Sequence, residues 1–383
     1  MRSGRPRIYP RTLVPPPSVS TRRTPVSERV PVREDLAAVQ PYGAPQVDAP
    51  VRLNTNETPY PPPPSFVANL RERIGTLDLH RYPDREHGML RAALAHRFGL
   101  GYDRVWAANG SNEILAQLHQ AYGGPGRTVL GTRPGFAALP TIARTTATAH
   151  AELPLDDAYR VDVDTAVEAV TAHRPHLVCL ARPNNPTGVS VALEVVRALH
   201  DASEALIVLD EAYAEFAADD ALPLLGELPR LVITRTFSKA FRLAGVRLGY
   251  LLGPEWVVDD LHKVRLPYHL DAMTQTAGVV ACELADEVTG HIGAIVAERE
   301  RLAGRLRQLP GVTVSPSDAN FLLVHVAADG VFDGLLARGV LVRDFSSAPG
   351  LQGCVRITVG TAEECDAAVA ALADLLGSEL PEG

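Results

Sequence analysis

Short apolar runs alternate with helical patterns along the middle of this sequence, and this alternation restricts the fold to a narrow class. The runs occupy residues 128–131, 177–181, 205–209, 231–234 and 246–252. Several lack polar alternation, which is typical of strands buried on both faces of a parallel sheet. Polar motifs follow their carboxyl ends, where open α/β sheets bind ligands. The sequence therefore predicts an α/β fold whose site lies at one edge of a mostly parallel sheet.

The order of the patterns divides the 383 residues into four predicted parts. Residues 1–33 are rich in Arg and Pro without apolar periodicity, which predicts a disordered tail; a transit peptide or a nucleic-acid arm is the alternative. Prolines then indicate an extended N-terminal arm at 34–64, followed by a large domain at 65–268. A long helical region at about 273–309 and short strand patterns predict a smaller α+β domain at 269–383, with strands at 312–314, 320–326, 340–343 and 354–359 and a helix at about 363–376.

Composition and charge exclude several function classes. Hydrophobic residues make up 46% and charged residues 21% of the chain, which is ordinary for a globular protein. No apolar run approaches a membrane span. The net charge is −8, of which residues 1–33 contribute +7, so the remainder carries −15 and argues against nucleic-acid binding. The four cysteines are widely separated, show no metal-ligand spacing and predict a reduced, cytoplasmic protein.

Lys239 is the first candidate catalytic residue. The sequence has two lysines among its 37 basic residues, so most positive charges are arginines. Lysine can lose its proton and form a Schiff base with a carbonyl, whereas a guanidinium cannot. Lys263 lies in an amphipathic helical pattern and is interpreted as a surface residue. Lys239 follows Thr236 and Ser238 and precedes Arg247, so it predicts an amine nucleophile among anion ligands.

Two further motifs follow strand patterns, at residues 182–188 (Arg-Pro-Asn-Asn-Pro-Thr-Gly) and 210–213 (Asp-Glu-Ala-Tyr). Either alone is ordinary turn or capping chemistry. Together with the glycine turn and helix start at 108–114 and the Lys239 segment, they match the needs of one cofactor, pyridoxal phosphate. It requires an amine, a carboxylate for its ring nitrogen, donors for its phenolate oxygen, an aromatic ring and a phosphate cradle.

Each requirement is assigned to named residues. Lys239 supplies the amine and acts as catalytic base, Asp210 holds the ring nitrogen, and Asn185 and Tyr213 reach the phenolate oxygen. Phe136 is predicted to stack on the ring, although core packing would explain it alone. The predicted phosphate cradle and its helix start comprise Gly110, Ser111, Asn112, Thr236, Ser238 and Arg247.

Eight motifs make the chain resemble histidinol-phosphate aminotransferases, which are fold-type I pyridoxal-phosphate enzymes. They occupy residues 56–60, 81–83, 109–111, 183–188, 210–213, 235–239, 243–249 and 356–360. The resemblance covers roughly residues 34–376. It implies a large domain and a smaller α+β domain, a transaminase active on L-histidinol phosphate and 2-oxoglutarate, and a role in histidine biosynthesis.

The resemblance also implies a homodimer with sites at the subunit interface. Tyr82 would then reach the neighbouring cofactor's phosphate. The implied substrate residues are Tyr42, Asn56, Arg343 and Arg356. Arg356 lies within an apolar strand pattern, so it predicts a bound anion or, as the alternative, an internal salt bridge.

Five positions depart from the usual pattern of the family: Thr58, Gly135, Arg182, Arg242 and Asp271. None of these departures removes a predicted cofactor contact, but together they leave the identity of the substrate undecided between several alternatives. The alternatives are an aminotransferase for aromatic amino acids or a secondary-metabolite precursor, a lyase like threonine-phosphate decarboxylase, and a non-enzymatic protein that retains the fold. The intact Lys239, Asp210 and Tyr213 set argues against the last.

Overall fold

The computed structural model describes residues 30–37, 39, 43 and 46–380, and it separates the chain into units Met1–Gln40 and Pro41–Gly383. The described part of the first unit contains a short 3-10 helix, η2 (Glu34–Leu36), next to an ion pair between Arg33 and Asp35 at 2.7 Å. The predicted tail lies outside the described residues except for its last four.

Within the described part of the second unit, seven strands form a mixed sheet in the order β2-β8-β7-β6-β5-β3-β4. Strands β4, β3, β5, β6 and β7 are mutually parallel, and β8 is antiparallel to both β7 and β2. The mostly parallel sheet is therefore confirmed. The strands are β2 (Val105–Ala108), β3 (Thr128–Arg133), β4 (Ala149–Pro154), β5 (Leu177–Ala181), β6 (Leu206–Asp210), β7 (Leu231–Thr236) and β8 (Gly249–Leu252).

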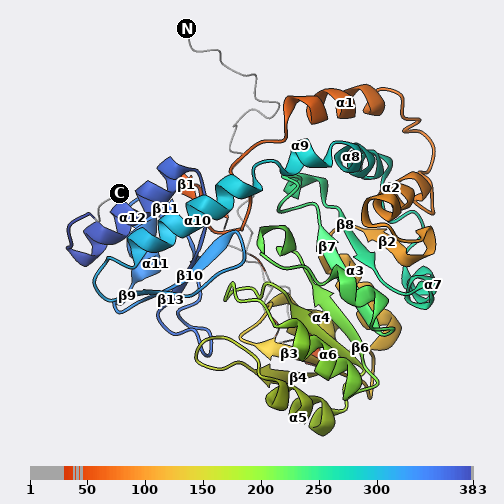
Figure 1. Ribbon diagram of the computed structural model, residues 1–383, viewed down its shortest axis with the longest axis horizontal. Helices are drawn as coiled ribbons and strands as arrows, with labels where there is room; N and C mark the ends of the chain where they lie inside the picture. The colour runs from red at the N-terminus through yellow and green to blue at the C-terminus, as the bar shows by residue number, and fades with distance from the viewer. Residues whose placement is uncertain (1–29, 38, 40–42, 44–45, 381–383) are drawn as a thin grey trace. The chain divides into compact units, whose positions relative to one another are not determined.

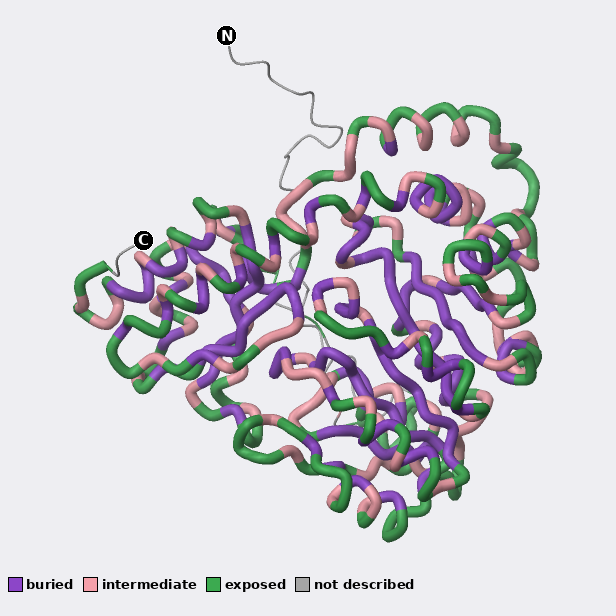
Figure 2. Tube along the Cα trace, in the orientation of Figure 1, coloured by how far each residue is buried: buried purple, intermediate pink, exposed green. Residues whose placement is uncertain are grey.

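Helices cover both faces of this sheet (Figure 1). Successive residues of a strand point to opposite faces, and in β5 Leu177 and Cys179 pack in one apolar cluster while Val178 and Leu180 pack in the other. Figure 2 shows the central strands as buried, with exposed residues on the outer helices. The first face is covered by α3 (Ser111–Tyr122), α4 (Ala138–Thr145) and α7 (Glu255–Val264), and the second by α2 (Gly88–Phe98), α5 (Val163–His173), α6 (Leu193–Asp201) and α8 (Ala272–Glu283).

The C-terminal part contains a separate antiparallel sheet in the order β12-β13-β10-β9. Its strands are β9 (Val312–Val314), β10 (Phe321–Val326), β12 (Arg343–Asp344) and β13 (Cys354–Thr358). A two-stranded parallel sheet joins β1 (Val51–Arg52) to β11 (Val340–Leu341). The helices here are α10 (Ile292–Leu306), α11 (Val331–Ala337) and α12 (Ala362–Leu376), and α12 begins with a capping box of Thr361 and Glu364.

Several predicted elements need correction. The run at 340–343 is two strands in different sheets, and the helical region at 273–309 is three helices, α8, α9 (Ala285–Thr289) and α10. Helix α8 packs against α1 (Pro64–Ile74) and α2, while the predicted division near residue 268 stays a prediction. The run at 246–252 is a strand only from Gly249, because Arg247 has a left-handed backbone with φ of 58°. The remaining short helices are η3 (Tyr102–Arg104), η4 (Ala214–Phe216), η5 (Leu222–Gly226) and η6 (Ala244–Val246).

Two predicted surface and core assignments can be compared with the structure. Lys263 lies on α7, where its exposed ammonium pairs with Asp260 at 2.5 Å, as the amphipathic pattern predicted. All four cysteines are free thiols, and Cys179 and Cys354 are buried. Among the described residues, no helix combines the length and apolarity needed to cross a membrane.

Candidate active site

The carboxyl ends of β5, β6 and β7 meet at a cavity of about 250 Å³. Ala181, Asp210 and Thr234 are register partners in these adjacent strands, so their side chains are set in one row. The cavity brings together most of the predicted site. Its walls include Asn56, Ser111, Asn112, Phe136, Asn185, Asp210, Tyr213, Thr236, Ser238, Lys239, Arg247, Arg343 and Arg356.

Asp210 is a buried carboxyl group at the end of β6. The hydroxyl of Thr234 donates to its Oδ1 atom at 3.2 Å, across the strand pair. Burial raises the pKa of Asp210 to about 6, although the Thr234 hydrogen bond opposes the shift. A cationic partner beside Asp210 would stabilise the ionised carboxylate and so offset the unfavourable burial of its charge. The protonated ring nitrogen of a pyridine is such a partner.

Tyr213 follows Asp210 on the same wall of the cavity. Its hydroxyl oxygen accepts hydrogen bonds from Nδ2 of Asn56 at 3.0 Å and from Nδ2 of Asn185 at 3.4 Å. Its ring packs edge-on against Phe321, with centroids 5.1 Å apart. These contacts hold the phenol and both amides together, as a phenolate-binding group requires.

Lys239 lies at the centre of the site. Its Nζ atom donates to the carbonyl oxygen of Thr55 at 2.9 Å. Burial lowers the pKa of Lys239 to about 7, and the nearby guanidiniums of Arg356 and Arg247 lower it further while Glu57 opposes them. A substantial fraction of the amine is therefore neutral near pH 7, which is the form that attacks a carbonyl.

The phosphate side of the cavity is formed by the start of α3 and the segment around Ser238. Gly110 has φ of 80°, and the helix begins at Ser111, so the first-turn amides face away from the helix body as an anion site. Arg247 donates from Nη1 to the Ser238 hydroxyl at 3.2 Å. A Cβ atom on Gly249 would lie 2.4 Å from the Gly110 carbonyl carbon. The cradle thus depends on glycine in β8.

The other end of the cavity carries two arginines. Arg343 and Arg356 are direct partners in the antiparallel pair β12–β13. Arg356 is buried and donates to Oδ1 of Asn185 at 2.6 Å and to the Asn54 carbonyl at 2.8 Å. Arg343 donates to the Gly43 carbonyl at 3.0 Å.

Of the predicted site residues that the structure describes, Gly110 and Tyr82 are not among those that line this cavity. Tyr42 lies outside the described residues. Tyr82 is 80% exposed and stacks on Tyr268, with ring centroids 4.5 Å apart. Its position on an exposed loop is compatible with a contact to a second subunit, and the role remains a prediction.

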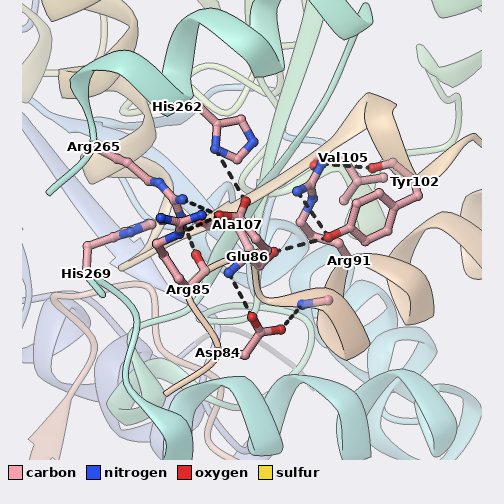
Figure 3. A network of polar contacts seen from close by, with 11 residues as sticks. Asp84, Arg85, Glu86, Arg91, Tyr102, Val105, Ala107, His262, Arg265 and His269 are labelled. Carbon is pink, nitrogen blue, oxygen red and sulfur yellow. Dashed lines mark hydrogen bonds and ion pairs between the residues drawn. The ribbon is translucent and has the colours of Figure 1, made fainter. Parts of the chain in front are cut away.

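The segment that follows Tyr82 is fixed by the polar network in Figure 3. Arg265 pairs with Glu86 at 2.8 Å. Asp84 accepts from the backbone amides of Glu86 and Gly88 at 2.9 and 2.6 Å. His269 contacts the Ala107 carbonyl at 3.1 Å through Nε2. These contacts tie the segment after Tyr82 to Arg265, and they tie His269 to the strand that leads to the Gly110 turn.

The departures from the family pattern have distinct structural roles. Gly135 lines the cavity, and a Cβ atom there would lie 2.2 Å from the Thr132 carbonyl. Arg182 is fully buried and pairs with Glu211 and Asp219 at 3.3 and 2.5 Å.

Arg242 and Asp271 hold connecting segments. Arg242 donates to Nδ1 of His291 at 2.6 Å and to the Pro61 carbonyl at 3.0 Å, and Asp271 caps α8. The buried Thr58 hydroxyl has no hydrogen-bond partner among the described residues.

Sequence reasoning missed several cavity residues. The backbone carbonyl of Asn54 accepts a hydrogen bond from Arg356, and that of Thr55 accepts one from Lys239. Every residue has a backbone carbonyl, so the residue types at these positions could not indicate either contact. Phe345 also lines the cavity. Its position two residues after Arg343 was the one signal, because alternate residues of a strand share a face.

The fold and the site define a class of enzyme, and comparison with known proteins confirms it. The family model for aminotransferase class I and II matches residues 49–372. The chain therefore belongs to this family and is a pyridoxal-phosphate-dependent aminotransferase, as the motifs predicted.

Its relatives narrow the class. Histidinol-phosphate aminotransferase of Mycobacterium marinum is 44% identical over 371 residues, covering 94% of this chain and 96% of the relative. Histidinol-phosphate aminotransferase of Mycolicibacterium smegmatis is 45% identical over 366 residues, which cover 92% of this chain and 95% of the relative. Within the class, the chain belongs to the histidinol-phosphate aminotransferase family.

A solved structure agrees with this assignment. Histidinol-phosphate aminotransferase from Sinorhizobium meliloti, in complex with pyridoxal-5′-phosphate, is 29% identical with a TM-score of 0.79. The match covers 86% of this chain and 91% of that one. The cavity also fits this cofactor on its own geometry, because an amine of lowered pKa, a buried carboxyl group and a glycine-dependent helix start lie together.

Proposed function

We propose that this chain transfers the amino group of L-histidinol phosphate to 2-oxoglutarate, giving imidazole-acetol phosphate and L-glutamate in histidine biosynthesis. The observation that carries the substrate assignment is the cross-strand pair of Arg343 and Arg356 on the cavity wall. A second anion site, beyond the cradle at Ser111, suits a substrate that bears its own phosphate. The names of the relatives support the same substrate.

The predicted site residues would divide the work as follows. Ser111, Asn112, Thr236, Ser238 and Arg247, with the Gly110 turn, would hold the cofactor phosphate. When bound, pyridoxal phosphate acts as an electron sink for the substrate's α-carbon. Asp210 would keep a proton on the ring nitrogen, Asn185 and Tyr213 would bind the phenolate oxygen, and Phe136 would cover the ring.

Lys239 is the proposed catalytic base. Its lowered pKa, about 7, leaves the amine able to accept the α-proton and return it to the adjacent carbon. The hydrogen bond to the Thr55 carbonyl positions the nitrogen within the cavity. One amine can therefore perform both proton transfers of the exchange.

Asn56, Arg343 and Arg356 would bind the substrate. Asn56 lines the cavity beside the proposed cofactor-binding residues, since its Nδ2 atom donates a hydrogen bond to the Tyr213 hydroxyl. Tyr42 is proposed as a further substrate contact from the arm. The protein would act as a cytoplasmic homodimer in which Tyr82 reaches the second site, and the exposed Tyr82 ring supports this arrangement.

The function is tested with purified holoenzyme and a panel of amine donors, each assayed with 2-oxoglutarate. Glutamate should form fastest with L-histidinol phosphate. Preferential turnover of phenylalanine or tyrosine would instead assign a paralogous aminotransferase. Carbon dioxide release from threonine phosphate would assign a lyase. A threonine-phosphate decarboxylase from Porphyromonas gingivalis has a TM-score of 0.76 at 24% identity, which shows a common fold alone.

The homodimer is tested separately by combining two inactive variants. Lys239→Ala removes the base, and Tyr82→Ala removes the proposed cross-subunit contact. If each site uses Lys239 of one subunit and Tyr82 of the other, mixed dimers regain one intact site of two. A monomeric holoenzyme with full activity would reject the arrangement.

A further inference from the structure

The turn that leads into α3 is closed by a side chain of the helix itself. Oε2 of Glu113 accepts hydrogen bonds from the backbone amide of Asn109 at 2.6 Å and from its Nδ2 atom at 2.7 Å. Gly110, the N-cap residue between them, has φ of 80° and no side chain that could cap the helix. One residue of the first helical turn therefore ties α3 to the chain before the Gly110 turn.

Helix α12 of the same chain shows what a complete capping box looks like. The N-cap hydroxyl of Thr361 accepts from the amide of Glu364 at 3.3 Å, and Oε2 of Glu364 accepts from the Thr361 amide at 2.9 Å. Glu113 and Glu364 occupy the same position, the third residue after the N-cap. In α12 the cap side chain occupies a first-turn amide, whereas in α3 no cap side chain does. The start of α3 thus keeps the half of the capping box that shapes the turn, and it omits the half that would compete with an anion for the amides.

The Glu113 carboxylate is held from the strand side and from the helix. Its Oε1 atom accepts from Nε2 of Gln117 at 3.3 Å, and the buried Trp106 of β2 donates from Nε1 to Oε1 of Gln117 at 2.8 Å. The side-chain amide of Asn109 also donates to the His269 carbonyl at 2.7 Å. The partners of Glu113 are therefore themselves fixed by neighbouring segments.

Two physical effects of Glu113 on a bound phosphate have opposite signs. A carboxylate in the first turn of α3 repels another anion at the same helix start, so its charge alone would weaken phosphate binding. Its hydrogen bonds to Asn109 hold the turn from which the first-turn amides project, so its geometry would strengthen binding. Three N–H donors already share its charge, and Glu113 is not among the residues that line the cavity. We therefore expect the geometric effect to outweigh the repulsion.

We propose that Glu113 is a positioning residue that shapes the Gly110 turn so that the first-turn amides of α3 bind the phosphate group of pyridoxal phosphate. This role rests on the phosphate cradle proposed above and is independent of the amine donor. Glu113 would thereby act on the affinity for the cofactor's phosphate and leave the reactivity of Lys239 unchanged.

The role is tested by titrating apoprotein with pyridoxal phosphate and, separately, with pyridoxal, which has the same aldehyde but no phosphate. Glu113→Met removes the acceptors and keeps the side-chain length, whereas Glu113→Gln removes the charge and keeps one oxygen for Asn109. We expect Met to weaken pyridoxal-phosphate binding about 5- to 20-fold without changing pyridoxal binding, and Gln to stay within about 3-fold of wild type. Unchanged or tighter binding of pyridoxal phosphate by the Met variant, an equal loss for both aldehydes, or an equal loss in the Gln variant would each overturn the proposal.

Glu364→Met is the matched control, because it removes the corresponding contact from α12. It should lower the midpoint of urea unfolding, as Glu113→Met does, but keep the preference for pyridoxal phosphate over pyridoxal within about 2-fold of wild type. An equal loss of that preference in the control would show an effect of stability alone and reject the role of Glu113. If wild type binds both aldehydes equally, the phosphate cradle itself is wrong and Glu113 has no such role. A preference that is present in wild type and retained in Glu113→Met rejects the role of Glu113 and leaves the cradle in place.

Discussion

The Nζ atom of Lys239 donates a hydrogen bond to the backbone carbonyl of Thr55, 2.9 Å away and 184 residues distant in sequence. The carbonyl lies immediately before Asn56, whose side chain binds Tyr213. One short segment near the start of the chain therefore orients both the amine and the phenol of the site.

The lowered pKa of Lys239 predicts how apoprotein captures its cofactor. The neutral amine is the reactive form, and with a pKa of about 7 its population falls as pH drops through 7. The rate of capture should therefore rise with pH and level off above about 8. Stopped-flow absorbance of apoprotein mixed with pyridoxal phosphate measures this rate. A midpoint near 10 would contradict the lowered pKa.

A control variant identifies the amine. Lys239→Ala should retain the fold by circular dichroism and lose turnover by at least about 10³-fold, since it removes both the nucleophile and the base. Borohydride reduction of wild-type holoenzyme followed by peptide mapping should place the pyridoxyl label on residue 239. A label on Lys263 would assign the chemistry elsewhere.

Asp210 is expected to destabilise the apoprotein at neutral pH. Its folded pKa, about 6, is above the ordinary value of 3.8, so the stability it contributes is present below pH 4 and lost as pH rises through 6. Two pKa units correspond to about 3 kcal/mol. Apo Asp210→Asn should therefore unfold at higher urea than wild type at pH 8, with a smaller difference at pH 5. The same variant should lose most of its turnover. Identical unfolding curves at pH 8 would contradict the burial cost.

Gly249 should control cofactor affinity through the Gly110 turn. In Gly249→Ala the new methyl group would meet the Gly110 carbonyl carbon at 2.4 Å and the Ser111 nitrogen at 2.4 Å. Displacement of the turn should weaken pyridoxal-phosphate binding by about 10-fold or more, and overpacking should cost about 1–3 kcal/mol of stability. Gly245→Ala is the matched control, because nothing lies within 4 Å of its Cβ position. Equal cofactor dissociation constants for both variants would remove Gly249 from the cradle.

The buried ion pair of Arg182 and Glu211 should matter far more than an exposed pair. Both side chains have no exposed surface, and Arg182→Met would leave Glu211 with one arginine partner fewer. We expect a loss of about 3–5 kcal/mol in the free energy of unfolding. Arg133→Met breaks an exposed pair with Glu152 and should cost at most about 1 kcal/mol. Urea denaturation of both variants compares them directly, and similar losses would contradict the burial argument.

The sequence was most informative where a strand was buried and ended in a polar motif. Residues 177–181 were predicted as observed, since an uninterrupted apolar run leaves few alternatives. Asp210 was proposed as a site residue because parallel strands place their carboxyl ends at one edge of the sheet. Lys239 was proposed because it is one of two lysines among 37 basic residues and has Thr236, Ser238 and Arg247 near it in sequence. Strand β4 was missed because it is an edge strand with mostly exposed or half-exposed residues.

Other contacts depend on geometry that residue types do not reveal. The carbonyl of Thr55 is a backbone atom, and any residue at that position supplies one. The strand at Val340–Leu341 pairs with the N-terminal β1 while Arg343 pairs with Arg356, a division that a continuous apolar run conceals. The role predicted for Tyr82 needs a second copy of the chain.

The contacts of Asn54 and Asn56 with strand β13 have a consequence for biosynthesis. Asn54 and Asn56 are joined to Arg356 and Thr358 across 302 positions of the chain, so these contacts close very long loops. Contacts between residues this far apart in sequence form slowly, because a long loop must close before they can be made. Both residues of each contact must be synthesised before this wall of the cavity can exist, so a nascent chain that stops before residue 356 lacks it.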